Sequence, residues 1–239
     1  MSASPFTDDG RLPTGAEKAR AVRSMFDAIA PRYDLVNRIM TFRMDVGWRK
    51  RAVRDLRLAP GATVVDLACG TGDLCRELTR NGLTPIGADL SFGMLANART
   101  AAPLLHADAL RLPFPDAVLD GATCGFALRN FVDLPAFLVE LARVLKPGGR
   151  IALLDVATPP NRLLRAGHSI YFGKVVPRIG ALLSDGEAYR YLPRSVAYLP
   201  EPDELMRIVR AAGFADATRT LLSGGISQLL VGTNAGEPA

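Results

Sequence analysis

A glycine turn that follows a run of apolar residues constrains the fold of this chain more than any other feature. Residues 63–67 are expected to form a buried strand, followed by a turn that contains Gly70 and Gly72 and then by a helix. A second expected strand ends on Asp89. Glycine adopts backbone angles closed to other residues, so such a turn lets a ligand approach the main chain. This layout is typical of an α/β sheet that binds a nucleoside.

The ligand of this turn is not expected to be a dinucleotide. The G-x-G-x-x-G pattern of dinucleotide sites needs a third glycine where Cys75 stands. Asp66 also brings a negative charge close to the turn, which a pyrophosphate would resist. A cofactor that combines a ribose, an amino-acid tail and a positive centre would tolerate both features. S-adenosylmethionine fits this description and is the expected cofactor.

Strands and helices are predicted to alternate beyond this turn. The expected strands are residues 63–67, 85–89, 104–107, 119–125, 150–156, 217–222 and 227–233, and the expected helices are residues 73–81, 91–99, 134–145 and 202–212. Ser91 is the expected N-cap of the helix at residues 91–99. The sequence Lys146-Pro147-Gly148-Gly149 is expected to form a turn that ends the helix at residues 134–145. This alternation indicates a mostly parallel α/β sheet with helices on both faces.

Helical segments are predicted before the sheet, and an insertion is predicted within it. Amphipathic spacing predicts helices at residues 16–30, 33–40 and 46–56, with Pro31 ending the first. We expect a flexible N-terminal arm over residues 1–14 and a single domain over residues 15–239. Within that domain, residues 15–60 are expected to form a helical lid. Residues 158–200, where the alternation lapses, are expected to cap the pocket.

Composition narrows the class of protein. The chain has 239 residues, of which 49% are hydrophobic and 22% charged, and this balance indicates one globular domain with a substantial core. No apolar stretch is long enough to span a membrane and no signal peptide is evident, so we expect a cytoplasmic protein. The three cysteines lack metal-ligand spacing, so no metal site is expected. The net charge of +5 comes without nucleic-acid-binding motifs, so no nucleic-acid partner is expected.

The carboxyl ends of parallel strands meet at one edge of a sheet, so residues at several strand ends should share a crevice. There Asp89 can accept hydrogen bonds from a ribose diol, and Asp108-Ala109 can meet the adenine. The backbone of residues 70–72 can hold the methionine tail, and Gly125 completes the crevice. Each of these aspartates could instead have a purely structural role. Asp89 could cap a helix, Asp108 could stabilise a turn, and Asp66 could be a buried aspartate that accepts hydrogen bonds from backbone donors.

Arg129 follows the fourth predicted strand and is a candidate for the chemical step. If the methyl acceptor is an aromatic ring carbon, a neighbouring hydroxyl must lose a proton and the developing oxyanion must be stabilised. A guanidinium can supply the positive charge or orient a water, although it is rarely a base itself. The alternative is a surface ion pair between Arg129 and Asp133.

Taken together, these segments resemble the C-methyltransferases of menaquinone and ubiquinone biosynthesis. The resemblance spans residues 25–232. It is carried by Met25-Phe26-Asp27, Arg32-Tyr33-Asp34, Asn37, Trp48-Arg49-Lys50, Asp66 to Leu74, Leu112-Pro113-Phe114, Phe126 to Asn130, Val144 to Arg150, Val176 to Gly180 and Tyr189-Arg190-Tyr191-Leu192. The glycine turn and the Lys146–Gly149 segment occur in many methyltransferases, whereas the regions of Tyr33-Asp34 and Arg129-Asn130 are more particular.

The resemblance implies a Rossmann-like class I S-adenosylmethionine-dependent methyltransferase with a seven-stranded sheet. It implies that the cofactor is contacted by Thr71, Asp89, Asp108, Ala109 and Gly125, and that Arg129, Tyr33 and Asp34 belong to the acceptor pocket. The implied reaction is C-methylation of a polyprenylated quinol ring, with demethylmenaquinol preferred. The alternatives are another small hydrophobic acceptor, such as a polyketide or lipid, and a regulatory protein that binds the cofactor without turnover.

The chain departs from the family pattern where the acceptor is expected to bind. The family usually has glycine or glutamine at Arg43, histidine at Asp45 and serine at Ala188. A prenyl tail would need an apolar channel, for which the candidates are Ile39, Met40, Phe42, Met44, Ile170, Tyr171, Phe172, Val175 and Val176. Because such a substrate resides in a lipid bilayer, we expect transient contact with the membrane surface. The sequence leaves open whether the chain forms a homodimer.

Overall fold

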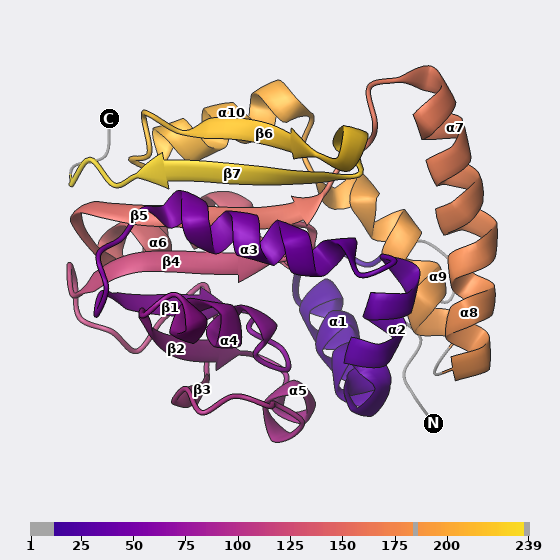
Figure 1. Cartoon of the computed structure of the whole chain (residues 1–239), viewed down its shortest axis with the longest axis horizontal. Coiled ribbons are helices and arrows are strands. Elements are labelled where there is room, and N and C mark those ends of the chain that lie inside the picture. The colour runs from indigo at the N-terminus through magenta and orange to yellow at the C-terminus, as the bar shows by residue number, and fades with distance from the viewer. Residues whose placement is uncertain (1–11, 184–185, 237–239) are drawn as a thin grey trace.

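A twisted seven-stranded sheet forms the centre of the molecule (Figure 1). The computed structural model describes residues 12–183 and 186–236. The strand order is β3-β2-β1-β4-β5-β7-β6, and β7 runs antiparallel to its neighbours while the other pairings are parallel. The strands are β1 (Thr63–Leu67), β2 (Thr84–Asp89), β3 (Leu104–His106), β4 (Leu119–Gly125), β5 (Leu145–Val156), β6 (Thr218–Leu222) and β7 (Ser227–Thr233). The predicted fold class is confirmed.

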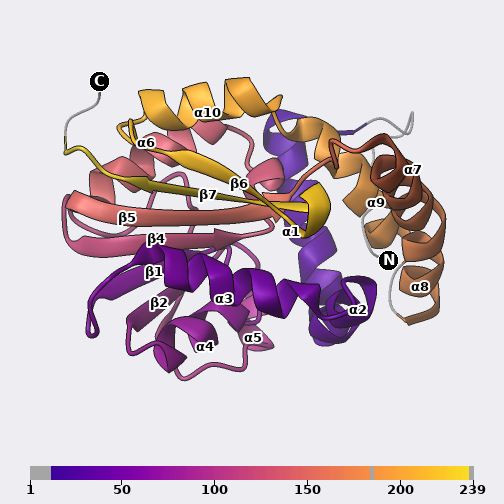
Figure 2. The same cartoon turned by 45° about the horizontal axis from the view of Figure 1, so that its top comes forward.

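Alternation along the strands divides the core into two layers. Val65 and Leu153 face one side of the sheet, where α6 (Leu134–Val144) and α10 (Pro202–Ala211) pack. Val64 and Leu154 face the other side, against α3 (Met44–Leu56) and α4 (Asp73–Arg80). Figure 2 shows helices above and below the sheet. Apolar side chains on both faces explain why these strands read as nearly continuous hydrophobic runs.

The N-terminal helices separate into two groups. Helices α1 (Gly15–Ile29) and α2 (Tyr33–Met40) flank the carboxyl ends of the strands, joined by a 3-10 turn that contains Pro31. Helix α3 instead packs its Trp48 and Leu56 side chains against the sheet. Within the expected lid, residues 15–60, α3 is therefore part of the core layer. Of the expected flexible arm, residues 1–11 lie outside the described residues.

The insertion expected at residues 158–200 is helical. It contains α7 (Arg162–Ile170), a π-helical stretch (Tyr171–Val175), α8 (Val176–Leu183), α9 (Gly186–Ser195) and a 3-10 turn (Val196–Tyr198). Val176 and Tyr191 pack with Met25, Val36 and Met40 of α1 and α2 in a third apolar cluster. Figure 1 shows α7, α8 and α9 beside α2 at one end of the molecule.

Two local predictions need correction. The Lys146–Gly149 segment does not simply separate a helix from a strand, because β5 already begins at Leu145, which pairs with Leu119. The next pair joins Gly121 to Arg150, so the pairing register shifts across this segment, which is an irregularity within the strand. Helix α5 (Phe92–Ala96) is shorter than the predicted 91–99, although Ser91 caps it as expected by accepting from the Met94 N–H at 3.1 Å.

The remaining differences in helix and strand bounds are small, at one or two residues. The predicted hairpin between β6 and β7 is present, with a 3-10 turn over Ser223–Gly225. Within the part of the chain that the structure describes, no helix combines the length and apolar character needed to cross a membrane.

Candidate active site

A cleft opens where β1, β2 and β4 end, at the edge of the sheet expected to bind a ligand. It encloses about 1150 Å³, counting the part open to solvent, a size suited to small-molecule reactants. Most of the residues predicted for the site line it: Tyr33, Asp66, Gly70, Thr71, Asp89, Asp108, Ala109 and Gly125. Within the described residues, Gly72, Asp34 and Arg129 lie outside its lining.

The turn after β1 has the backbone geometry that the sequence predicted. Gly70 and Gly72 have φ values of +55° and +82°, in the region that favours glycine. Gly72 precedes α4, and a Cβ atom on it would lie 2.7 Å from the Thr100 side chain. Gly72 therefore shapes the turn that brings Gly70 and Thr71 to the cleft, and it does not itself line the cleft.

Asp89, at the end of β2, is held in place by the glycine turn. Its Oδ2 accepts a hydrogen bond from the Gly70 N–H and its Oδ1 from the Ser91 N–H, each at 2.8 Å. Burial raises the pKa of Asp89, and these two hydrogen bonds offset part of that rise. Each oxygen of an ionised carboxylate can accept a further hydrogen bond. Asp89 can therefore meet a ribose diol from a fixed position.

Asp66, on β1, is fully buried from solvent and also lines the cleft. The hydrogen-bond donors to Asp66 are side chains, whereas the purely structural alternative expected backbone donors. The Thr123 hydroxyl donates to Oδ1 at 2.8 Å and the Cys75 thiol donates to Oδ2 at 3.4 Å. Burial raises the pKa of Asp66 to about 7, although both hydrogen bonds and the charge of Arg49 oppose the rise. A nearby positive ligand would favour the ionised form.

Asp108 and Gly125 both line the cleft, and each also has a structural role in the fold. The Asp108 carboxylate accepts from the Leu110 N–H at 2.9 Å, so Asp108 is a turn residue and lines the cleft as well. A Cβ atom at Gly125 would approach the Leu74 side chain to 2.9 Å. Close packing therefore explains this glycine at the end of β4. Ala109 also lines the cleft.

Tyr33 and Asp34 reach the site in different ways. Tyr33 lines the cleft, and burial raises the pKa of its hydroxyl. Its ring packs edge to face against Phe26 of α1, with ring centres 5.9 Å apart. Asp34 instead accepts a hydrogen bond from the Thr71 hydroxyl at 2.5 Å. Asp34 thus links α2 to the glycine turn and acts on the cleft through Thr71.

Arg129 is buried and does not line the cleft, and the alternative of a surface ion pair with Asp133 is wrong. Its guanidinium forms a buried ion pair with Asp155 and donates to the Ser195 hydroxyl at 3.0 Å and the Phe126 carbonyl at 2.7 Å. Asp133 instead caps α6 by accepting from the Ala136 N–H. Arg129 thus joins β5 to the cap and does not line the cleft, although its charge acts on Tyr33, where it opposes the rise in the pKa of that hydroxyl.

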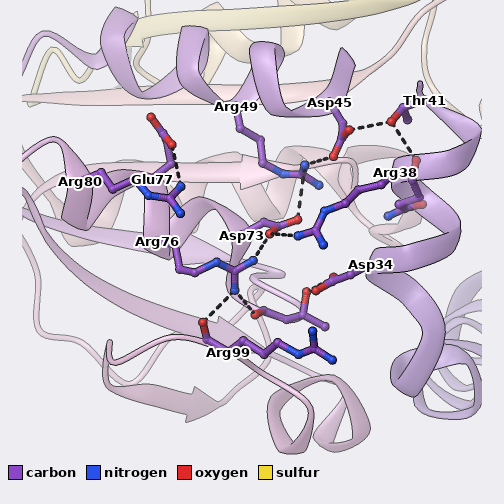
Figure 3. A network of polar contacts seen from close by, with 12 residues as sticks. Asp34, Arg38, Thr41, Asp45, Arg49, Asp73, Arg76, Glu77, Arg80 and Arg99 are labelled. Atoms are coloured by element: carbon purple, nitrogen blue, oxygen red, sulfur yellow. Dashed lines mark hydrogen bonds and ion pairs between the residues drawn. The ribbon is translucent and has the colours of Figure 1, made fainter. Parts of the chain in front are cut away.

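Sequence reasoning missed an arginine of the cleft. Arg49 of α3 lines the cleft together with Asp73, the first residue of α4. Figure 3 shows Arg49, Arg38 and Arg76 converging on the Asp73 carboxylate. The Trp48-Arg49-Lys50 segment was part of the family resemblance, but no spacing rule connected Arg49 with the glycine turn.

The lining fits S-adenosylmethionine in its charge. Four carboxylates line the cleft, those of Asp66, Asp73, Asp89 and Asp108. They are suited to a ligand with a sulfonium and an ammonium group. Apolar side chains also line the cleft, among them Ala19, Val22 and Phe26 of α1, together with Phe131 and Val132. The cleft therefore offers space for a polar cofactor beside a hydrophobic acceptor.

Sheet order and cleft define a class I S-adenosylmethionine-dependent methyltransferase. Solved methyltransferases share this fold. A SAM-dependent methyltransferase from Thermotoga maritima superposes with a TM-score of 0.61 at 21% identity, covering 89% of this chain and 99% of that one. A SAM-dependent methyltransferase from Aquifex aeolicus has a TM-score of 0.56 at 17% identity, covering 78% and 89% of the two chains.

The chain belongs to the ubiE/COQ5 methyltransferase family, whose sequence model matches residues 14–234. The demethylmenaquinone methyltransferase of Deinococcus radiodurans is 42% identical, with 92% of this chain and 96% of the relative covered. The enzyme of the same name from Thermus thermophilus is 44% identical, covering 87% and 99%. The ubiquinone/menaquinone biosynthesis C-methyltransferase of Geobacter sulfurreducens is 39% identical, covering 90% and 89%.

Proposed function

We propose that this protein transfers a methyl group from S-adenosylmethionine to a ring carbon of demethylmenaquinol, forming menaquinol. The observation that supports this most is the two-part cleft, in which carboxylates at the ends of β1 and β2 adjoin an apolar space between α1 and Phe131. Relatives over 40% identical along nearly their whole length bear the name demethylmenaquinone methyltransferase.

The residues of the cleft would act mainly by alignment. Bound S-adenosylmethionine supplies an activated methyl group on a sulfonium centre. Asp89 would hold the ribose diol, and Asp108-Ala109 would meet the adenine. Gly125, Thr71 and Gly70 would shape the wall between the ribose and the acceptor. Correct alignment of two reactants can account for a large part of such a rate enhancement.

Tyr33 is the residue we assign to the acceptor itself. It lines the cleft, and its raised pKa keeps the hydroxyl protonated, so it can donate a hydrogen bond to a quinol oxygen as negative charge develops there. Asp34 is a positioning residue, because its carboxylate accepts a hydrogen bond from the Thr71 hydroxyl. Arg129 would support the site from below, through Asp155 and the cap.

The family departures do not favour a different acceptor. Asp45 pairs with Arg49, and Ala188 is buried among apolar side chains of the cap. Arg43 precedes α3 with a φ of +62°, where the usual glycine of the family would be unstrained. None of these three described residues lines the cleft. The same holds for the nine residues expected to form a tail channel.

Methyl transfer from labelled S-adenosylmethionine tests the proposal. Demethylmenaquinol, a ubiquinol precursor and simple phenols are offered separately, and the methylated product is identified by mass spectrometry. We expect carbon methylation of demethylmenaquinol at the highest rate. Transfer to a phenol or lipid alone would contradict the substrate, and cofactor binding without transfer to any acceptor would favour a regulatory role.

We also propose that the cap end of the molecule contacts an anionic membrane surface. Residues 156–184 contain no Asp or Glu but include Arg162, Arg165, Lys174 and Arg178. The same segment exposes large apolar side chains, with Leu163 84% and Leu182 87% exposed. Apolar side chains together with basic ones are typical of interfacial helices.

The turn between α2 and α3 adds to this surface. Phe42 is 70% exposed, and both Phe42 and Arg43 have left-handed backbone conformations, which cost energy for residues other than glycine. The Phe42 ring lies 5.6 Å from that of Tyr171, and the Tyr171 hydroxyl donates to the Met40 carbonyl at 2.9 Å. Phe42 is therefore held on the same face as α7 and α8, which we call the cap face.

A further inference from the structure

The amino-acid end of the cofactor poses a problem of charge. S-adenosylmethionine carries a carboxylate as well as its positive groups, and the cleft is lined by four Asp residues. Among the described residues that line the cleft, the positive charges belong to Arg23 and Arg49. A carboxylate brought into this space without a cation would be repelled. One of these arginines must therefore face it.

Arg23 is at the wrong end of the cleft for this role. It is exposed and lies 3.9 Å from Asp27, whose carboxylate accepts from Ser91 and Gly93 near the start of α5. That is the side of Asp89 and the end of β2. In the sheet order β3-β2-β1-β4, the adenosine would extend from the end of β3 towards β1.

Arg49 lies at the opposite end. Helix α3 packs against β4, β5 and β7, and Arg49 reaches from it to Asp73, which follows the glycine turn. The Arg49 side chain is only 10% exposed, and its guanidinium carbon lies 5.5 Å from the centre of the Phe126 ring. Its Nη1 pairs with Asp45 and lies 3.5 Å from Asp73 Oδ2 (Figure 3). Both carboxylate contacts use Nη1, so Nη2 is left to face a ligand.

The backbone of the glycine turn is less available than its sequence suggests. We expected residues 70–72 to hold the methionine tail through main-chain groups. The Gly70 N–H, however, already donates to Asp89 at 2.8 Å, and the Gly72 N–H donates to the Cys69 carbonyl at 2.9 Å. These two donors are engaged within the fold, which leaves the Thr71 N–H of the turn and the side chains of the cleft as partners for the tail.

We propose that Arg49 binds the carboxylate of S-adenosylmethionine and that Asp73 binds its ammonium group. The two side chains line the cleft 3.5 Å apart and carry opposite charges, which matches the zwitterion of an amino acid. Arginine to carboxylate hydrogen bonds are among the stronger ones in proteins. Asp45, together with Arg38 and Arg76, holds this pair in position. The assignment rests on the cofactor class given above, but not on the identity of the methyl acceptor.

The test compares two ligands that differ at this end. S-adenosylhomocysteine has the amino-acid group, and 5′-methylthioadenosine lacks it but keeps the adenosine. Their dissociation constants are measured calorimetrically for the natural protein, Arg49→Gln and Arg54→Gln. Arg54 is on the same helix, but its side chain is 69% exposed and does not line the cleft, so it is the matched control.

We expect Arg49→Gln to weaken the binding of S-adenosylhomocysteine at least about tenfold, as for loss of a hydrogen bond to a charged group. The dissociation constant of methylthioadenosine should stay within about twofold of its value for the natural protein. Arg54→Gln should change neither constant by more than about twofold. Unchanged binding of S-adenosylhomocysteine to Arg49→Gln, or equal weakening of both ligands, would overturn the assignment.

A second variant covers loss of folding. Removing Arg49 leaves Asp45 buried without its partner, so Asp45→Asn/Arg49→Gln is measured as well, after circular dichroism has established its fold. It should show the same selective loss. Failure of the natural protein to bind either ligand would instead contradict the cofactor class, and failure to methylate demethylmenaquinol would leave these binding results unaffected.

Discussion

Single residues of the cleft gain their properties from burial beside a few specific partners. Asp66 illustrates this, because its carboxylate has a raised pKa despite hydrogen bonds from Thr123 and Cys75. The run of apolar residues around Asp66 predicted that Asp66 is on a strand, but not which groups would surround it. The donors come from β4 and α4, the elements on either side of β1.

The pKa of Asp66 makes stability depend on pH. The native value of about 7 exceeds the unfolded value of about 3.9, so the native state binds more protons between those values. The contribution of Asp66 to stability is therefore greatest below about pH 4 and is lost as the pH rises through about 7. We expect Asp66→Asn to become more stable than the natural protein, by about 2 to 4 kcal/mol, between pH 5 and pH 8. Urea unfolding at both pH values measures this difference, and parallel pH curves for the two proteins would contradict it.

At the scale of elements, polar contacts hold the cap and α1 against the sheet. Arg129 connects β5 with α9 through Asp155 and Ser195. Lys18 of α1 donates to the Phe131 carbonyl at 2.8 Å and lies 3.7 Å from the centre of the Tyr198 ring. Burial, with a smaller effect of Arg129, lowers the pKa of Lys18 to about 8. These contacts link segments that are far apart in the sequence.

Replacing Arg129 should therefore affect folding before chemistry. Asp155 is fully buried, and Arg129→Met would leave it without its ion-pair partner. We expect a loss of about 3 to 5 kcal/mol in the free energy of unfolding, and recovery of most of it in Arg129→Met/Asp155→Leu. Urea denaturation measures both variants. A stable Arg129→Met protein with normal cofactor binding but no methyl transfer would instead favour the direct role in the acceptor pocket.

At the scale of the whole molecule, charge and exposed apolar area are unevenly distributed. The net charge of +5 is small, but the segment of the cap from residue 156 to residue 184 carries only basic charges. The cap face lies at one end of the molecule, beside α2 (Figure 1). We therefore expect the protein to approach a hydrophobic acceptor in a bilayer with its cap face.

Vesicle flotation tests the cap face. We expect the protein to bind vesicles that contain phosphatidylglycerol but not vesicles of phosphatidylcholine alone. Binding should weaken at high salt, because salt screens the attraction between the basic residues and the anionic lipid. Leu163→Glu/Leu182→Glu should reduce the bound fraction at least about tenfold, since each leucine contributes about 1.5 to 3 kcal/mol when buried.

The control is Val139→Glu, at an exposed apolar residue of α6 outside the cap face. It should bind vesicles like the natural protein. Absence of flotation by the natural protein would contradict the membrane proposal. Analytical ultracentrifugation of the same proteins shows whether the two leucines instead join a homodimer, in which case the glutamates would dissociate it and leave flotation unchanged.

The sequence alone determined the order of strands and helices, the glycine turn and the carboxylates at the strand ends, because these depend on local periodicity and on residues a few positions apart. Strands 63–67, 119–125 and 227–233 and helix 33–40 have the predicted bounds. Only the tertiary structure decided that Arg49 lies in the cleft and Arg129 beneath it. Their partners, Asp73 and Asp155, are far along the chain, and no spacing rule encodes which long side chains meet when helices pack on a sheet. The same holds for the cap, whose direction depends on its packing against α1 and α2.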